Sequence, residues 1–352
     1  MKKYFNKGLI YQWFNSAKMM IILGIVVWGF FSNVMVEGNI NDVTRTIASK
    51  FESGYRLNII FNYGILGIIF ALIHFMSQGI NKRYNNMFLT GAPYTKKQIK
   101  YNEFICLMIN LVIFIAVQVY ICVMAYIRDY ELMAIVDGYF TALGIEVLRM
   151  ILFGTAGILI LLIIDSMFSN TIMGIICMIS ILPASLFFII YRFLSILDYV
   201  PAGINISMLD KFGSLIGESL FYRKHIYLLE NANAAKIDSS MLFSEAAIVI
   251  LLIVVLLIVY YIMQNRFKVE SSTKMFTSKL NEKIIVIITS IGAGTAVSTM
   301  FLTSYIYDLR GAYHQPLAGT QLIKVLSIDL GVTIFVALIV YKLIRRFVNS
   351  LQ

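Results

Sequence analysis

The sequence predicts an all-α, polytopic helical membrane protein with about eight transmembrane helices. Of its 352 residues, 59% are hydrophobic, which is far more than a soluble globular protein needs to fill a core. The apolar residues form runs of about 20 residues, the length at which a helix crosses the hydrocarbon of a bilayer. Composition and run length therefore point to the same fold class.

The positive charges predict how these runs are oriented. The net charge is +10, but Lys and Arg gather at the ends of apolar runs instead of on a separate polar domain. Because cytoplasmic loops are enriched in Lys and Arg, both termini and the loops around Lys96 and Lys274 are predicted to be cytoplasmic. The same distribution argues against a surface for nucleic acid, so the lipid bilayer is the expected surrounding.

The first half of the chain contains four predicted spans. Before them, residues 2–14 combine lysines with aromatic side chains, which predicts a cytoplasmic elbow helix in the headgroup region. The loop at residues 37–57 and the loop around Asp129 carry no excess of positive charge, so both are predicted to lie outside. The spans are predicted at residues 17–36, 58–79, 104–127 and 143–168.

The second half of the chain contains four more predicted spans. Residues 169–170 leave only a tight inner turn before span five, and Pro183 is expected to kink that span. The long loop at residues 194–240 is predicted to be external and to hold an amphipathic helix. In span seven, Gly292 and Gly294 are small enough to let neighbouring helices approach closely. These spans are predicted at residues 171–193, 241–263, 284–306 and 322–345.

A compact basic island, Asn81–Glu103, lies between spans two and three and reads NKRYNNMFLTGAPYTKKQIKYNE. Gly91–Pro93 break the chain, and Thr95 with Gln98 has the spacing of a capping box, in which each side chain bonds the other's backbone N–H. The pattern predicts a short, capped helix parallel to the membrane surface, with lysines over its first turns. The alternative is that these lysines only anchor a cytoplasmic loop.

The island resembles the junction after the second span in ABC-2 type transporter permeases, where a basic pair, a turn with proline and a Thr or Ser precede the third span. The resemblance implies a coupling helix that docks on an ATPase subunit. The coupling residues that it implies are Tyr84, Met87, Phe88, Leu89, Pro93, Thr95, Lys96, Lys97 and Gln98. The amphipathic part of the external loop resembles the extracellular gate of the same class, with Phe212, Leu215 and Ile216 as gate residues.

By this resemblance the chain is the permease subunit of an ATP-binding cassette exporter and is not itself an enzyme. It has no GxxxxGK[ST] loop and no cytoplasmic segment long enough to fold as a nucleotide-binding domain. ATP and magnesium are therefore expected in a partner ATPase subunit, while this chain is expected to bind no cofactor or metal. A second permease chain, identical or homologous, completes the implied assembly.

The resemblance divides the chain into residues 1–265, an ABC-2-like transmembrane domain, and residues 266–352. The second part is a basic link followed by two spans beyond those of a minimal permease. Bacterial permeases associated with the export of antimicrobial peptides or amphiphiles are similar in this extension. The implied location is a bacterial cell membrane, and the implied substrate is a peptide, an antibiotic or a lipid-like amphiphile.

Polar residues inside the spans are the remaining candidates for function. On spans two and three they either line a translocation path or join helices by hydrogen bonds, and they are Asn62, His74, Asn110 and Gln118. Three cysteines, Cys106, Cys122 and Cys177, have no metal-ligand spacing and are predicted to be packing residues.

Charged residues in the spans leave other functions open. Glu146 and Arg149 are three residues apart and are predicted to pair, whereas Asp165 and Glu245 are predicted to reach water near span ends. Asp329, like His74, has no partner that the sequence identifies. An ion-coupled secondary transporter or channel built on these last two residues is therefore an alternative, and a non-transporting scaffold or sensor is another.

Overall fold

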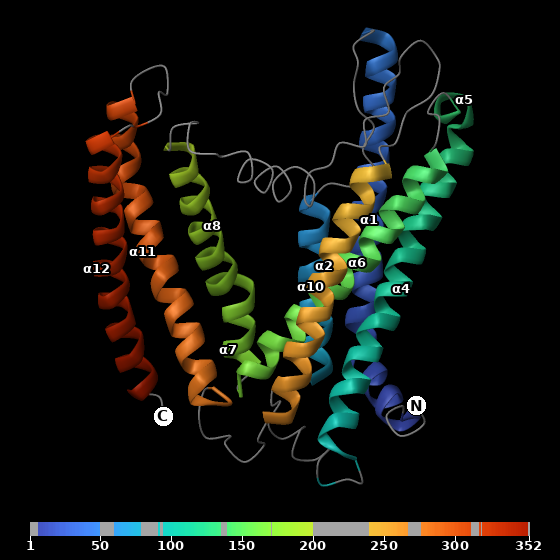
Figure 1. Cartoon of the computed structure of the whole chain (residues 1–352). Helices are drawn as coiled ribbons and strands as arrows, with labels where there is room; N and C mark the ends of the chain where they lie inside the picture. The colour runs from blue at the N-terminus through green and yellow to red at the C-terminus, as the bar shows by residue number, and fades with distance from the viewer. Residues whose placement is uncertain are drawn as a thin grey trace. The chain divides into compact units, whose positions relative to one another are not determined.

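The chain is an all-α, multi-pass membrane protein, as the sequence predicts. Almost all described residues of the computed structural model are helical (Figure 1). The single pairing of extended backbone among them is an isolated bridge between Phe168 and Phe276. Seven helices in the described part are long and apolar enough to cross a membrane. The structure describes residues 6–49, 60–78, 91, 94–134, 139–169, 171–199, 239–266, 276–310, 317 and 319–350.

The helices form two compact units, and the first contains most of the N-terminal half together with α10. Helix α1 packs against both α2 and α4, and α10 contacts α4. The second predicted span, α2, is shorter than the seven long helices. The helices of unit 1 are α1 (Lys7–Ser49), α2 (Ile60–Gln78), α4 (Lys96–Arg128), α5 (Tyr130–Met133), α6 (Tyr139–Met167, up to Ile163) and α10 (Ser239–Arg266).

Helix α1 is much longer than the predicted first span. It is continuous from Lys7 to Ser49, so no break separates the predicted elbow from the span, and the prediction of a loop from residue 37 is wrong as far as residue 49. No proline interrupts this stretch, and Glu37 forms an ion pair of 2.7 Å with Arg128 at the end of α4. Ile40, just beyond the predicted span, is buried in a cluster with residues of α4, α5 and α6, so apolar packing supports the start of a segment whose polar composition is typical of a loop.

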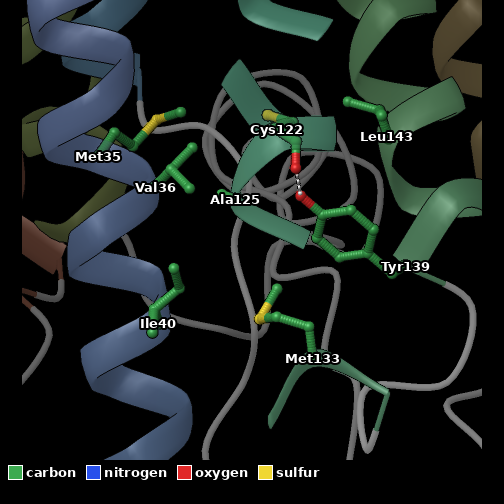
Figure 2. Close-up of a cluster of buried hydrophobic side chains, with 8 residues drawn as sticks. All are labelled: Met35, Val36, Ile40, Cys122, Ala125, Met133, Tyr139 and Leu143. Carbon is green, nitrogen blue, oxygen red and sulfur yellow. Dashed lines mark hydrogen bonds between the residues drawn. The ribbon is translucent and has the colours of Figure 1, made fainter. Parts of the chain in front are cut away.

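One buried cluster joins four helices of unit 1 where α4 ends (Figure 2). The hydroxyl of Tyr139, on α6, donates a hydrogen bond of 2.9 Å to the backbone carbonyl of Cys122, on α4. Cys122 is fully buried, and Cys106 and Cys177 are also buried, each as a free thiol, as predicted. The cluster consists of Met35, Val36, Ile40, Cys122, Ala125, Met133, Tyr139 and Leu143.

Replacing Tyr139 by Phe should lower the stability of unit 1 by about 0.5–1.5 kcal/mol, because the ring remains but the buried hydrogen bond is lost. Thermal unfolding of the detergent-purified protein measures this change. Tyr120→Phe on the same α4 is the matched control, since Tyr120 is 65% exposed. Equal melting temperatures for the two variants would contradict the expected contribution of the hydrogen bond.

Unit 2 is built from the end of α6 and five further segments of helix, in which α11 packs against both α8 and α12. The predicted fifth span is helical throughout, but it contains a π-helical turn just before Pro183. Proline has no N–H to donate to the carbonyl four residues earlier, and such a wider turn is a common local response. The segments are α7 (Thr171–Ile176), η1 (Cys177–Ile181), α8 (Leu182–Tyr199), α11 (Lys279–Arg310) and α12 (Gly319–Ser350).

The start of α11 is attached to the end of α6 within unit 2. The rings of Phe168 and Phe276 lie 5.2 Å apart, and the backbone N–H of Thr277 donates to the carbonyl of Met167 at 3.0 Å. The hydroxyl of Ser278 then accepts from the N–H of Asn281 and caps α11. The turn at residues 168–169 is thus covered by the segment that precedes α11.

The two units group the helices differently from the boundary predicted at residue 266. Span five, which forms α7, η1 and α8, belongs to the same unit as α11 and α12 and packs against α11. The predicted boundary rests on a resemblance, which packing does not test. The grouping shows that α11 and α12 are integral to a compact unit of the transmembrane region.

Candidate functional site

The best-defined candidate site lies at the base of unit 1, where α4 begins. Thr95 has extended backbone angles (φ −80°, ψ 149°), and its Oγ1 accepts from the N–H of Gln98 at 3.3 Å. In return, the Gln98 Oε1 accepts from the Thr95 N–H at 2.9 Å. The predicted capping box is therefore confirmed, and it fixes the point at which the helix starts.

The helix that follows the cap differs from the prediction. Instead of a short helix parallel to the surface, α4 continues without interruption from Lys96 to Arg128. Residues 96–103 contain no glycine or proline, so nothing separates the lysine-rich turns from the apolar run. The basic turns are consequently the first turns of a membrane-spanning helix, and a displacement of the cap would act directly on that helix.

Two lysines at this end of α4 have partners within the unit. The ammonium of Lys97 lies over the ring of Tyr261, 5.6 Å from its centroid. Lys100 Nζ is 2.7 Å from Glu103 Oε2, and both side chains are 9% exposed. Lys100 therefore contributes a neutral, buried ion pair to the base, whereas Lys97 remains near the surface.

The base of α4 is bonded to α1 and α10 as well. The side chain of Asn6 caps α1 by accepting from the N–H of Gly8 at 2.9 Å, and the backbone N–H of Asn6 donates to Asn102 Oδ1 at 3.3 Å. From α10, the hydroxyl of Tyr260 donates to the carbonyl of Lys100 at 3.0 Å. Three helices thus meet through specific hydrogen bonds at the capped end.

Apolar contacts and a small pocket complete this base. Leu9 of α1 and Ile99 of α4 are buried against each other and against Tyr94. The pocket opens beside them between the start of α1, the end of α2 and the start of α4, and it is lined by Leu9, Gln12, Trp13, Ser16, Ser77, Gln78, Ile99, Asn102 and Glu103. Six of its nine lining residues are polar, which is unusual for residues on helices that cross a membrane.

Several of the predicted coupling and gate residues fall outside the described part of the chain. Of the coupling set, Thr95, Lys97 and Gln98 are described with their side chains, and Lys96 is described as the first residue of α4. Gly91 is helical, although a break was predicted there. The residues outside the description are Tyr84, Met87, Phe88, Leu89, Pro93, Phe212, Leu215 and Ile216.

Three of the four residues predicted to line a path, His74, Asn110 and Gln118, are buried and bonded along their own helices. His74 is fully buried, and its Nε2 lies 2.9 Å from Gln78 Nε2. The amide of Asn110 donates to the carbonyl of Cys106, and the amide of Gln118 to the sulfur of Cys122, both within α4. Asn62 lies on α2, with its side chain outside the description. A role as path lining stays a prediction.

The charged residues predicted inside the spans have different outcomes, and the predicted pairing of Glu146 with Arg149 in unit 1 is confirmed. Arg149 Nη1 is 2.8 Å from Glu146 Oε1, so the predicted pair forms, and the Tyr63 hydroxyl donates to Glu146 Oε2 at 3.1 Å. In unit 2 the prediction for Asp165 is wrong, because this residue is 1% exposed within the chain and does not reach the surface. The Glu245 side chain lies outside the description.

The partner of Asp329 is Arg192, which sequence reasoning missed. Arg192 Nε and Nη2, on α8, lie 2.9 and 2.8 Å from Asp329 Oδ1, on α12. The hydroxyl of Ser298, on α11, donates to the same oxygen. The only feature of the sequence that could have predicted this pair is an arginine inside the apolar run of span five, because a charge inside a membrane span needs a partner of opposite sign.

The comparisons with known proteins place this chain in no family. No family model, curated protein or solved structure matches it.

Proposed function

We propose that the chain is the transmembrane permease subunit of an ATP-binding cassette exporter in a bacterial cell membrane. A separate ATPase subunit binds at the basic island and hydrolyses the ATP. The observation that carries the proposal is the capped start of α4, which is hydrogen-bonded to α1 and α10. A soluble partner that pushes on this point would act on three membrane helices together.

The resemblance of the island to ABC-2 type permeases supports the same function, as does the absence of a phosphate-binding loop in the chain. A second permease chain, identical or homologous, would complete the transporter. The class of substrate follows the resemblance only: a peptide, an antibiotic or a lipid-like amphiphile. The orientation with both termini in the cytoplasm is part of this proposal.

An ion-coupled transporter is a weaker candidate. Such a mechanism needs an intramembrane group that binds an ion or a proton and releases it during the cycle. The two residues that suggested it are engaged in the structure, Asp329 by Arg192 and Ser298, and His74 by Gln78. Neither of the two therefore favours the alternative.

The proposed docking is tested by changing the island and measuring ATPase capture. Replacing Phe88 and Leu89 together by Asp should abolish co-purification of a chain that contains a GxxxxGK[ST] loop, because charges would enter a buried contact. Thr95→Ala should cost about 0.5–2 kcal/mol of helix stability at the cap and weaken capture partially. ATPase activity of the assembled complex should fall in the same order.

Leu280→Asp is the matched control, because Leu280 is an exposed apolar residue at the start of α11, outside the island. Its ATPase capture should equal that of the unmodified protein. Full capture and full activity in both island variants would show that the island only anchors the chain in the membrane.

A further inference from the structure

We propose that the pocket at the base of unit 1 binds the headgroup of a phospholipid that carries a primary ammonium, such as phosphatidylethanolamine. The pocket is formed where α1 and α4 begin and α2 ends. This inference goes beyond the proposed transport function and does not depend on an ATPase. It follows from a donor and an acceptor in the pocket, from the charges around them and from the position of the pocket.

The pocket contains one hydrogen-bond donor that the described residues leave unused, and one carboxylate acceptor. Trp13 is 8% exposed, and its Nε1 has no hydrogen-bond partner among them. Glu103 bonds Lys100 through Oε2 at 2.7 Å, and its side chain is 9% exposed, so its Oε1 can accept a hydrogen bond from a ligand in the pocket. A buried indole N–H costs free energy unless a ligand or water satisfies it, and a carboxylate oxygen beside it can accept from the same ligand.

The charges in the pocket favour a zwitterion. Lys100 and Glu103 together have no net charge, so an anion or a cation alone would leave one unbalanced charge in a poorly solvated place. A phosphoethanolamine headgroup adds no net charge to the pocket, because its positive ammonium and its negative phosphate balance each other. The ammonium would donate to Glu103, and the phosphate would accept from Trp13.

The size of the pocket selects among zwitterionic headgroups. It has room for only a few water-sized groups, which suits the two-carbon ammonium tip of ethanolamine. A choline headgroup is bulkier, and its quaternary nitrogen has no N–H to donate to the carboxylate. We therefore expect discrimination between ethanolamine and choline lipids.

The pocket lies where a lipid headgroup would be found. The lining residues of α1 and α4 belong to the first turns of helices that are long enough to span a membrane, and those of α2 to its last turn. Tryptophan is enriched at this level of membrane proteins. On the same part of α1, Tyr11 and Met19 are 75% and 72% exposed and offer an apolar surface for acyl chains.

The test uses the fluorescence of Trp13 in the full-length protein. The chain has two tryptophans, so Trp28→Phe leaves Trp13 as the single reporter. The protein is reconstituted into phosphatidylcholine vesicles with increasing phosphatidylethanolamine. We expect a saturable change in Trp13 emission, and a half-saturating lipid fraction about tenfold higher with Glu103→Gln, as for the loss of one charge-assisted hydrogen bond.

Three comparisons make the outcome decisive. Glu131→Gln, on α5 and away from the pocket, should leave the titration unchanged, which separates binding from effects of lipid composition on the bilayer. Phosphatidylglycerol vesicles should give no saturable change. Free ethanolamine should not replace the lipid, because it lacks the phosphate and the acyl chains.

Equal titrations with phosphatidylglycerol would overturn the ammonium assignment, and saturation by free ethanolamine would overturn the lipid source. Unaltered titration in Glu103→Gln would overturn the site. If Trp28→Phe does not fold, native mass spectrometry of the unmodified protein and of Glu103→Gln gives the same decision. Phosphatidylethanolamine should stay bound to the unmodified protein and should be lost from Glu103→Gln.

Discussion

Replacing Arg192 by Leu should destabilise unit 2 by about 3–5 kcal/mol, the largest loss that we expect from any single substitution in this protein. The guanidinium is 3% exposed and the carboxylate of Asp329 is 7% exposed, so both charges are removed from solvent. They hold α8 and α12 together, and Ser298 adds α11 to the same carboxylate oxygen. The loss of Arg192 would leave a buried carboxylate without its counter-charge.

The size of this effect depends on the unpaired charge and not on the ion pair itself. Desolvating two charges costs nearly as much as their attraction returns, so removing both can be nearly neutral. The double variant Arg192→Leu with Asp329→Leu should therefore be more stable than either single variant. Ser298→Ala should cost less than either, because the ion pair persists without the hydroxyl.

Thermal unfolding in detergent, read out by protease cleavage within α8, α11 and α12, measures these differences. Arg128→Leu is the control, because Arg128 also pairs with carboxylates but its side chain is 54% exposed. It should unfold like the unmodified protein, since exposed ion pairs contribute little. If Arg192→Leu is as stable as this control, the charge pair does not hold unit 2 together.

The contrast between two ion pairs shows what the sequence predicts and what it does not. Glu146 and Arg149 are three residues apart on one helix, so the helical repeat alone places them side by side. Arg192 and Asp329 are 137 positions apart, and only the packing of α8 against α11 and of α11 against α12 brings them together. A local repeat contains no information about which helices become neighbours.

The same distinction holds at the candidate site. The cap formed by Thr95 and Gln98 was predictable, because both partners lie within one turn. The bonds from Asn6 to Asn102 and from Tyr260 to Lys100 were not, because they join different helices. The continuation of α1 past residue 37 was missed for the same reason, because Ile40 is buried against residues of other helices.

The predicted small-residue contacts of α11 are confirmed by the distances to its neighbours. A Cβ built on Gly294 would lie 2.5 Å from the carbonyl oxygen of Thr333 in α12, and one on Gly292 would lie 2.6 Å from the Cα of Ser185 in α8. Both contacts are with backbone, which cannot rotate away as a side chain does. The absence of a side chain at these two positions is therefore what allows α11 to approach both helices.

Gly294→Ala and Gly292→Ala should each destabilise unit 2 by about 1–3 kcal/mol, because one methyl group forces a helix to shift, and Val should cost more than Ala. Gly331→Ala on α12 is the matched control: a Cβ there meets nothing within 4 Å. Since alanine favours helix over glycine, the control should be neutral or more stable by about 0.5–1 kcal/mol. The measurement is the thermal transition of purified protein, with size-exclusion chromatography to verify folding. If the two alanine variants on α11 melt together with Gly331→Ala, the helices do not lie as close as these distances require.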